Sequence, residues 1–206
     1  MQAEDRNDNE TPGARIVHPG SRQLFRYWES RRAERPCPLR SDLSLAPLAK
    51  ILGDMAILEQ NASEAWIFRL AGGNVCDLLR ADVTGTDAVM CFEGITRAMM
   101  ARNFAYATRN TQPGIMKMRV ITDSQIIPAE VIYLPVMNAE TGHVQLLCGF
   151  FAFNEVASDE RGIPVLCEVI SSKLIWTEHL AGNMLLDEVG RVTPGSYLRV
   201  IEGGKA

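Results

Sequence analysis

The residue types that usually carry catalysis are present in this chain, but their spacing matches no common catalytic arrangement. The sequence has no Gly-x-Ser-x-Gly nucleophile motif, no Walker phosphate loop and no His–Glu cluster with metal-ligand spacing. We interpret Asp123, Glu130 and Glu140 as turn or surface carboxylates. The sequence therefore predicts neither a catalytic residue nor a metal site.

The thiol and imidazole side chains are scattered along the chain. The cysteines are odd in number, widely spaced and without a Cys-x-x-Cys pair, which predicts reduced thiols and a cytoplasmic location. Of the three histidines, His18 lies in the polar N-terminal stretch, His143 at an expected hairpin turn and His179 beyond the expected core. The cysteines are Cys37, Cys76, Cys91, Cys148 and Cys167.

Arginines gather near the N-terminus and raise the question of an anionic partner. They could meet an acidic protein, an anionic lipid or a nucleic acid, but Glu29 and Glu34 lie among them, so we favour a solvated, ion-paired helix face. The net charge of −4 gives no electrostatic reason to expect nucleic acid. The arginines are Arg22, Arg26, Arg31, Arg32, Arg35 and Arg40.

The bulk composition is that of an ordinary globular domain with extensions. The chain has 206 residues, of which 47% are hydrophobic and 22% charged. No apolar run approaches the roughly 20 residues that span a bilayer, and the polar, acidic stretch 1–9 does not resemble a signal peptide.

The elements that must position these side chains centre on a predicted antiparallel meander at 115–122, 126–135 and 144–153. Upstream, helical spacing predicts a helix over 21–35, capped by Ser21, with Leu24, Tyr27 and Trp28 on one face. The remaining predicted elements are a short helix or turn at 43–52, strands at 55–59 and 65–71, a helical turn at 74–79, a helix at 92–106, a strand or helix at 163–170 and a helix at 173–179.

Both faces of the meander are apolar. Side chains alternate across a strand, so one face carries residues that would be an exposed patch if nothing covered them. We expect the helix with Leu24, Tyr27 and Trp28 to cover this face, from the same chain or from a second copy. The face comprises Ile132, Leu134, Leu147, Phe151 and Phe153.

The opposite face lies under the helix at 92–106, on which Phe92, Ile95, Met99 and Tyr106 are expected to point inward. It predicts either a cavity for a small hydrophobic ligand, with adaptable methionine walls, or an ordinary packed core, and we favour the packed core. In a cavity, Tyr133 could orient a ligand through its hydroxyl. The candidate lining residues are Met99, Phe104, Met116, Met118, Tyr133, Cys148 and Phe150.

This order of elements, together with four short motifs, resembles a small family of PAS-like proteins found mainly in alphaproteobacteria. The motifs are Tyr27-Trp28, the stretch 38–42 (Pro-Leu-Arg-Ser-Asp), the strand end 68–72 (Phe-Arg-Leu-Ala-Gly) and the step 83–85 (Val-Thr-Gly). The chain departs from the family after Asp42, where Leu-Ser-Leu replaces Ile-Asp-Pro. We expect Arg40 and Asp42 to form a local pair or cap that holds the lead helix to the domain.

The resemblance implies an α+β fold: a five-stranded antiparallel sheet with helices on one face and an N-terminal helix covering the other. We divide the chain into a mobile tail (1–19), a helical lead (20–53), a PAS-like domain (54–155) and a partly helical or disordered C-terminal extension (156–206). The resemblance also implies a stand-alone sensory or regulatory module rather than an enzyme, commonly a homodimer. A ligand-free adaptor is the alternative, and an isomerase-like enzyme ranks last.

No cofactor is predicted. Haem needs an axial ligand, and no histidine falls on the helix over the expected pocket. A photochemical flavin site needs a cysteine in a Gly-x-Asn-Cys-Arg-like run. In the run 73–79 Cys76 follows Asn74 one residue late, and Ala88 occupies the reactive position after Gly85. A homodimer, a protein signalling partner and a small hydrophobic ligand are the expected partners, without nucleic acid or a membrane span.

Overall fold

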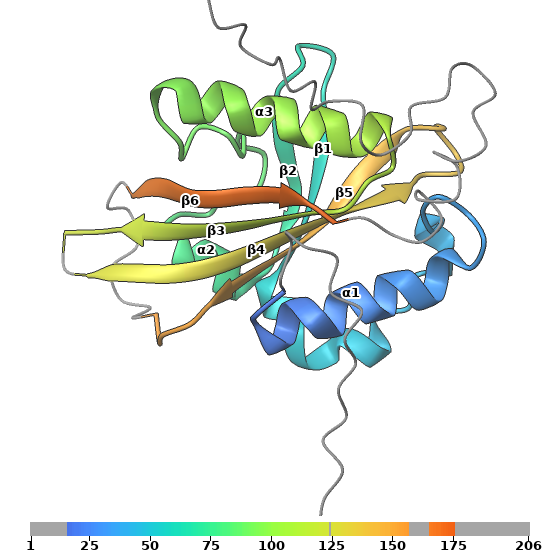
Figure 1. Ribbon diagram of the computed structural model, residues 1–206, viewed down its shortest axis with the longest axis horizontal. Helices are drawn as coiled ribbons and strands as arrows, with labels where there is room; N and C mark the ends of the chain where they lie inside the picture. Colours follow the sequence, from blue (N-terminus) through green and yellow to red (C-terminus); the bar gives the residue numbers. More distant parts are fainter. Residues whose placement is uncertain (1–15, 124, 157–164, 176–206) are drawn as a thin grey trace, which may run out of the picture.

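The structure is a computed structural model that describes residues 16–123, 125–156 and 165–175 (Figure 1). Six strands form one sheet in the order β2-β1-β5-β4-β3-β6, and every neighbouring pair is antiparallel. The α+β fold class is confirmed. The strands are β1 (Met55–Gln60), β2 (Trp66–Ala71), β3 (Gly114–Ile121), β4 (Ile126–Met137), β5 (Val144–Ala152) and β6 (Leu166–Leu174).

Helices cover both faces of the sheet. Helix α3 (Gly94–Arg109) lies on one side and α1 (Pro19–Arg32) on the other (Figure 1). The short helix α2 (Gly73–Leu78) packs with α3 on what we call the inner face. A 3₁₀ helix, η2 (Ala46–Asp54), accompanies α1 on the outer face, and a short turn, η1 (Arg40–Asp42), precedes it.

The alternation predicted for the meander is confirmed. Met116, Val131 and Cys148 lie in the hydrophobic cluster of the inner face, whereas Ile132 and Leu147 lie in that of the outer face. Two separate cores therefore share one sheet, because consecutive residues of β3, β4 and β5 serve opposite faces.

The sheet has six strands rather than the five predicted, because β6 lies beside β3. Residues 166–170, which belong to the stretch predicted as a strand or a helix, form part of β6. Its residues pair with β3 from Gly114↔Leu174 to Ile121↔Leu166, and Arg119 and Glu168 form an ion pair across the two strands at 2.6 Å. Lys173 and Leu174, predicted to begin a helix, belong to this strand. The predicted helical residues 176–179 and the unpatterned stretch 182–206 lie outside the described residues.

The start of α1 also differs from the prediction. His18, not Ser21, is the N-cap: Nδ1 of His18 accepts a hydrogen bond from the backbone N–H of Gly20 at 3.1 Å, and Pro19 occupies the first helical position. Ser21 is buried within the helix. The helix ends at Arg32, because Ala33 takes a positive φ of 52°. The ordered chain thus reaches into the stretch predicted to be a mobile tail, although residues 1–15 lie outside the described part.

The predicted inward face of the long helix is wrong. Met100, Phe104 and Ala107 are its buried residues, whereas Ile95 is 88% exposed. The helix begins at Gly94, so Phe92 is buried from the preceding segment rather than from the helix. Tyr106 is exposed and Met99 only partly buried.

Candidate functional site

The residues predicted to line a ligand pocket meet in the inner core. Six of them are buried there, and Met99 packs against them partly buried. The ring of Phe104 meets that of Tyr133 edge-on with centroids 5.2 Å apart, and the ring centroids of Phe68 and Phe150 are 5.9 Å apart. The six are Phe104, Met116, Met118, Tyr133, Cys148 and Phe150.

The Tyr133 hydroxyl, predicted to orient a ligand, is engaged by the protein. It shares a hydrogen bond of 3.3 Å with the Ser172 hydroxyl of β6, and the amide of Asn103 donates to the same Ser172 oxygen at 3.1 Å. Burial raises the pKa of Tyr133. The arrangement ties β6 and α3 to the centre of the sheet and favours a structural role for this hydroxyl.

The residues predicted to dock the lead helix meet as expected, within one chain. Leu24 and Trp28 are fully buried against the outer face, and the indole N–H of Trp28 donates to the carbonyl of Pro135 at 2.7 Å. Tyr27 joins them and exchanges two hydrogen bonds with the backbone of Ser44. Ile132, Leu134, Leu147 and Phe151 form the other side of this contact. Phe153 instead stays 43% exposed at the margin.

Arg40 and Asp42 hold the lead segment through different partners. Asp42 accepts a hydrogen bond from the backbone N–H of Leu39 at 3.3 Å and forms an ion pair with Arg35, just beyond the end of α1. The Arg40 guanidinium donates to the side-chain carbonyl of Gln145 on β5 at 3.2 Å. The contacts fit the predicted anchoring role, but not as a pair between these two residues.

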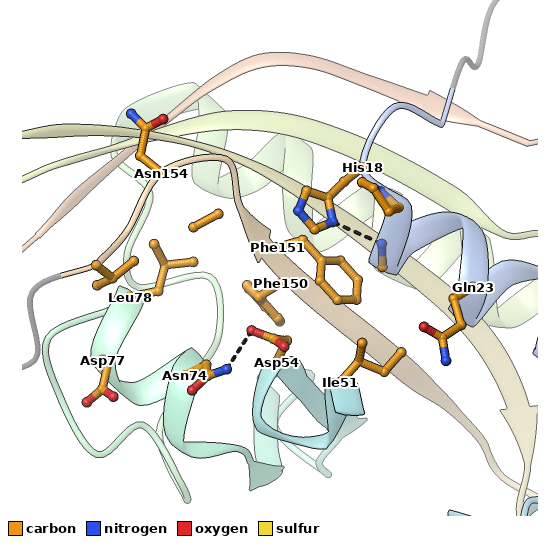
Figure 2. Close-up of a pocket in the computed structure, with 14 residues that line it drawn as sticks. His18, Gln23, Ile51, Asp54, Asn74, Asp77, Leu78, Phe150, Phe151 and Asn154 are labelled. Carbon is orange, nitrogen blue, oxygen red and sulfur yellow. Dashed lines mark hydrogen bonds between the residues drawn. The ribbon is translucent and has the colours of Figure 1, made fainter. Parts of the chain in front are cut away.

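A cleft of about 440 Å³ lies where the two cores meet at one end of β5. His18 and Gln23 of the α1 region stand on one side of it, and Asn74, Asp77 and Leu78 of α2 on the other (Figure 2). The floor includes Phe150, which belongs to the inner core, and Phe151, which belongs to the outer one. A molecule in this cleft would touch both helices and both cores.

The lining of the cleft combines apolar side chains with polar ones and carries two carboxylates. Asp54 and Asp77 contribute carboxylates, and Asn74 donates to Asp54 at 2.9 Å (Figure 2). Gln23 and Asn154 add amides, and no lysine or arginine is among the described lining residues. Such a lining suits a small molecule that offers hydrogen-bond donors or a positive charge beside an apolar part.

His18 shapes the α1 side of the cleft. Its ring stacks on Phe151 with centroids 4.9 Å apart and meets Phe153 edge-on at 5.3 Å. Burial lowers the pKa of His18, against the opposing charges of Glu130 and Asp54. Gly20 permits the close approach, because a Cβ atom there would lie 2.3 Å from the Phe151 ring.

Glu130 anchors the chain immediately before α1. It is fully buried on the outer face, and its carboxylate accepts hydrogen bonds from the backbone N–H groups of Val17, at 2.9 and 3.2 Å, and His18, at 2.8 Å. Arg22 closes the other side by donating to the carbonyl of Val17 at 2.5 Å. The prediction of a turn or surface carboxylate is wrong.

Neither His18 nor Glu130 was predicted as a site residue, although the sequence carried signals for both. His18 directly precedes a proline at a helix start, which is the N-cap position. Glu130 lies on the same side of the strand as Ile132 and Leu134, so its carboxylate falls on an apolar face. A carboxylate buried there needs a hydrogen-bond partner. That partner, a backbone segment more than a hundred residues away, has no signature of its own.

A second cavity, of about 360 Å³, lies beside the segment that leads into α3. Its lining is mainly apolar, with Phe68, Leu79, Met90 and Val165, and it includes Cys91. Among the described residues, no three His, Cys, Asp or Glu side chains cluster so that they could hold a metal ion. None of the helices in the same part of the chain has the length and apolar character that a bilayer crossing requires.

A family model described as "PAS domain" matches residues 16–152. The match starts at the segment that Glu130 anchors and ends with the last residue of β5, so it includes α1 and most of both cores and of the cleft lining. Asn154 and Val156 of the cleft and the whole of β6 lie beyond it. No curated protein matches the sequence.

Proposed function

Because the chain belongs to the PAS domain family, we propose that it is a sensory or regulatory module that binds a small ligand and signals through the packing of α1. The main support for this proposal is the cleft, whose walls come from both α1 and α2. A ligand that contacts α1 in one packing arrangement more than in another shifts the population between them. The readout would be contact with a protein partner.

The cleft supports the proposal better than the inner core does. The core residues predicted as a pocket are packed ring against ring, and the Tyr133 hydroxyl is bonded to Ser172. The cleft instead offers volume, two carboxylates and three amide side chains. We therefore place a polar, donor-bearing ligand there, in place of the small hydrophobic ligand that the sequence predicts for the core.

Homodimerisation stays part of the proposal, with a changed geometry. The outer face needs no second copy to cover it, since Leu24 and Trp28 of the same chain are fully buried there. A dimer built on this face would exchange α1 between two copies and preserve the same contacts. A ligand-free adaptor is the second candidate, favoured by the packed inner core.

Native mass spectrometry of the gently purified full chain tests the ligand site. Asn154→Trp places a large ring at an exposed position that lines the cleft, and Glu155→Trp adds the same ring at the exposed neighbour, which does not line it. We expect a co-purified small molecule with the wild type and Glu155→Trp, and its loss with Asn154→Trp. A molecule retained by Asn154→Trp contradicts the cleft as its site, and wild-type protein that carries no molecule favours the adaptor.

A further inference from the structure

Two cysteines that are far apart in the sequence lie side by side. Cys91 belongs to the segment before α3, and Cys167 to β6. The backbone N–H of Cys167 donates to the carbonyl of Cys91 at 3.0 Å. This backbone hydrogen bond brings the two residues close together, and a disulfide requires Cα atoms roughly 4.4–6.8 Å apart.

The two side chains are also close enough for one to affect the other. The neighbouring Cys91 side chain, together with burial, raises the pKa of Cys167. The Cys91 thiol donates to the carbonyl of Ala88 at 3.3 Å.

Cys91 differs from the other cysteines in access. It is partly exposed, whereas Cys37, Cys76, Cys148 and Cys167 are buried. Cys91 also lines the cavity of about 360 Å³, whose walls are mainly apolar. A molecule as small as a hydroperoxide fits within this volume and would reach Cys91 before any buried thiol.

We propose that Cys91 and Cys167 are a thiol modification site, at which a hydroperoxide oxidises Cys91 and Cys167 then closes a reversible disulfide. In the first step the Cys91 sulfur attacks the peroxide, the O–O bond breaks, and Cys91 becomes a sulfenic acid as the peroxide is reduced to water or an alcohol. In the second step Cys167 attacks that sulfur, the S–O bond breaks, and hydroxide leaves with the Cys167 proton as water. A dithiol reverses the reaction by exchange.

The disulfide would fasten the edge strand to the body of the domain. β6 pairs with β3 on one side only, and its Ser172 bonds Tyr133 and Asn103 in the inner core. A covalent link at Cys167 prevents the strand from separating from the domain in the native state. It also restricts the conformations that the unfolded chain can adopt. For so long a closed loop, Tm should rise by roughly 10 °C.

Hydrogen peroxide is the probe, applied to the reduced full chain, with intact mass and peptide mapping as readouts. We expect the loss of two hydrogens, a peptide that links Cys91 to Cys167, and reversal by dithiothreitol. Oxidation at the exposed Met90 adds oxygen mass instead, so the two reactions are distinguishable. Cys91→Ser should abolish the link, and Cys76→Ser, a matched change at a buried cysteine, should keep it.

The wild-type peptide map decides the question even where a variant fails to fold, and Cys167→Ala serves as the second variant. A Cys91–Cys167 peptide that appears with peroxide and disappears with dithiothreitol supports the site. Oxidation of Cys91 to the sulfinic acid without a link overturns it, as does a disulfide between Cys91 and any other cysteine.

Discussion

Glu130 shows how a single buried carboxylate can fix the position of a helix. On the outer face it is surrounded by apolar side chains, and its hydrogen-bond partners are the backbone N–H groups of Val17 and His18. A buried carboxylate without such donors would be costly, so the segment before α1 and the carboxylate stabilise each other.

Glu130→Ala tests this mutual dependence. We expect the free energy of unfolding to fall by about 1–3 kcal/mol, because two partly buried N–H groups lose a charged acceptor. Urea unfolding followed by circular dichroism measures the change. Glu140→Ala, at an exposed turn, should stay within about 0.5 kcal/mol of the wild type. Equal stabilities of the two variants would contradict an anchoring role for Glu130.

His18 makes the free energy of unfolding depend on pH. Burial lowers its pKa in the folded state, so the unfolded chain binds the proton more readily. Stability is therefore full above the unfolded value of 6.5 and falls as the pH drops through 6.5 toward the lowered folded pKa. Glu130 and Asp54 oppose the shift, and Arg22 adds to it.

His18→Asn separates titration from capping, because asparagine can still accept the hydrogen bond from Gly20 but does not titrate. We expect the loss of unfolding free energy between pH 7.5 and 5.5 to be smaller in this variant than in the wild type. His143→Asn, at an exposed turn, should keep the wild-type slope. Equal slopes in the wild type and His18→Asn would show that His18 does not carry the dependence.

At the scale of elements, the sequence predicts what depends on local pattern. The meander and its two faces follow from alternation in β3, β4 and β5, and the match of Leu24 and Trp28 to the outer face follows from helical spacing. The face of α3 was misassigned because Ile95, Met99, Met100 and Phe104 allow more than one apolar stripe. Packing on Tyr133 and Trp66 selects the stripe with Phe104.

The residues of β6 alone leave its structure open between a strand and a helix. Its stretch mixes Glu168, Ser171 and Ser172 with apolar side chains, and only one side of it is paired. What makes it a strand is the free edge of β3, about fifty residues earlier in the chain. The cleft was missed for a related reason: its walls come from α1, α2 and the end of β5, which meet only in the folded molecule.

At the scale of the whole molecule, α1 stands apart from the rest of the fold. It contacts the sheet through the outer cluster and the hydrogen bond from Trp28 to Pro135, while β1 to β6 share the inner cluster and a continuous ladder of hydrogen bonds. The proposed signal requires that α1 can undock while the sheet stays folded. Hydrogen exchange measures the free energy of such a partial opening separately from that of global unfolding.

The variant Ile127→Val distinguishes a partial opening of α1 from global unfolding. Ile127 is fully buried in the inner cluster, and a partial opening of α1 would leave that cluster intact. The change should cost about 1 kcal/mol of global stability. Amides at the centre of β4, which exchange only on global unfolding, should then exchange about five-fold faster. Amides of α1 should keep their wild-type rates. If they accelerate by the same factor, α1 opens only when the whole domain unfolds, and a signal carried by its undocking is excluded.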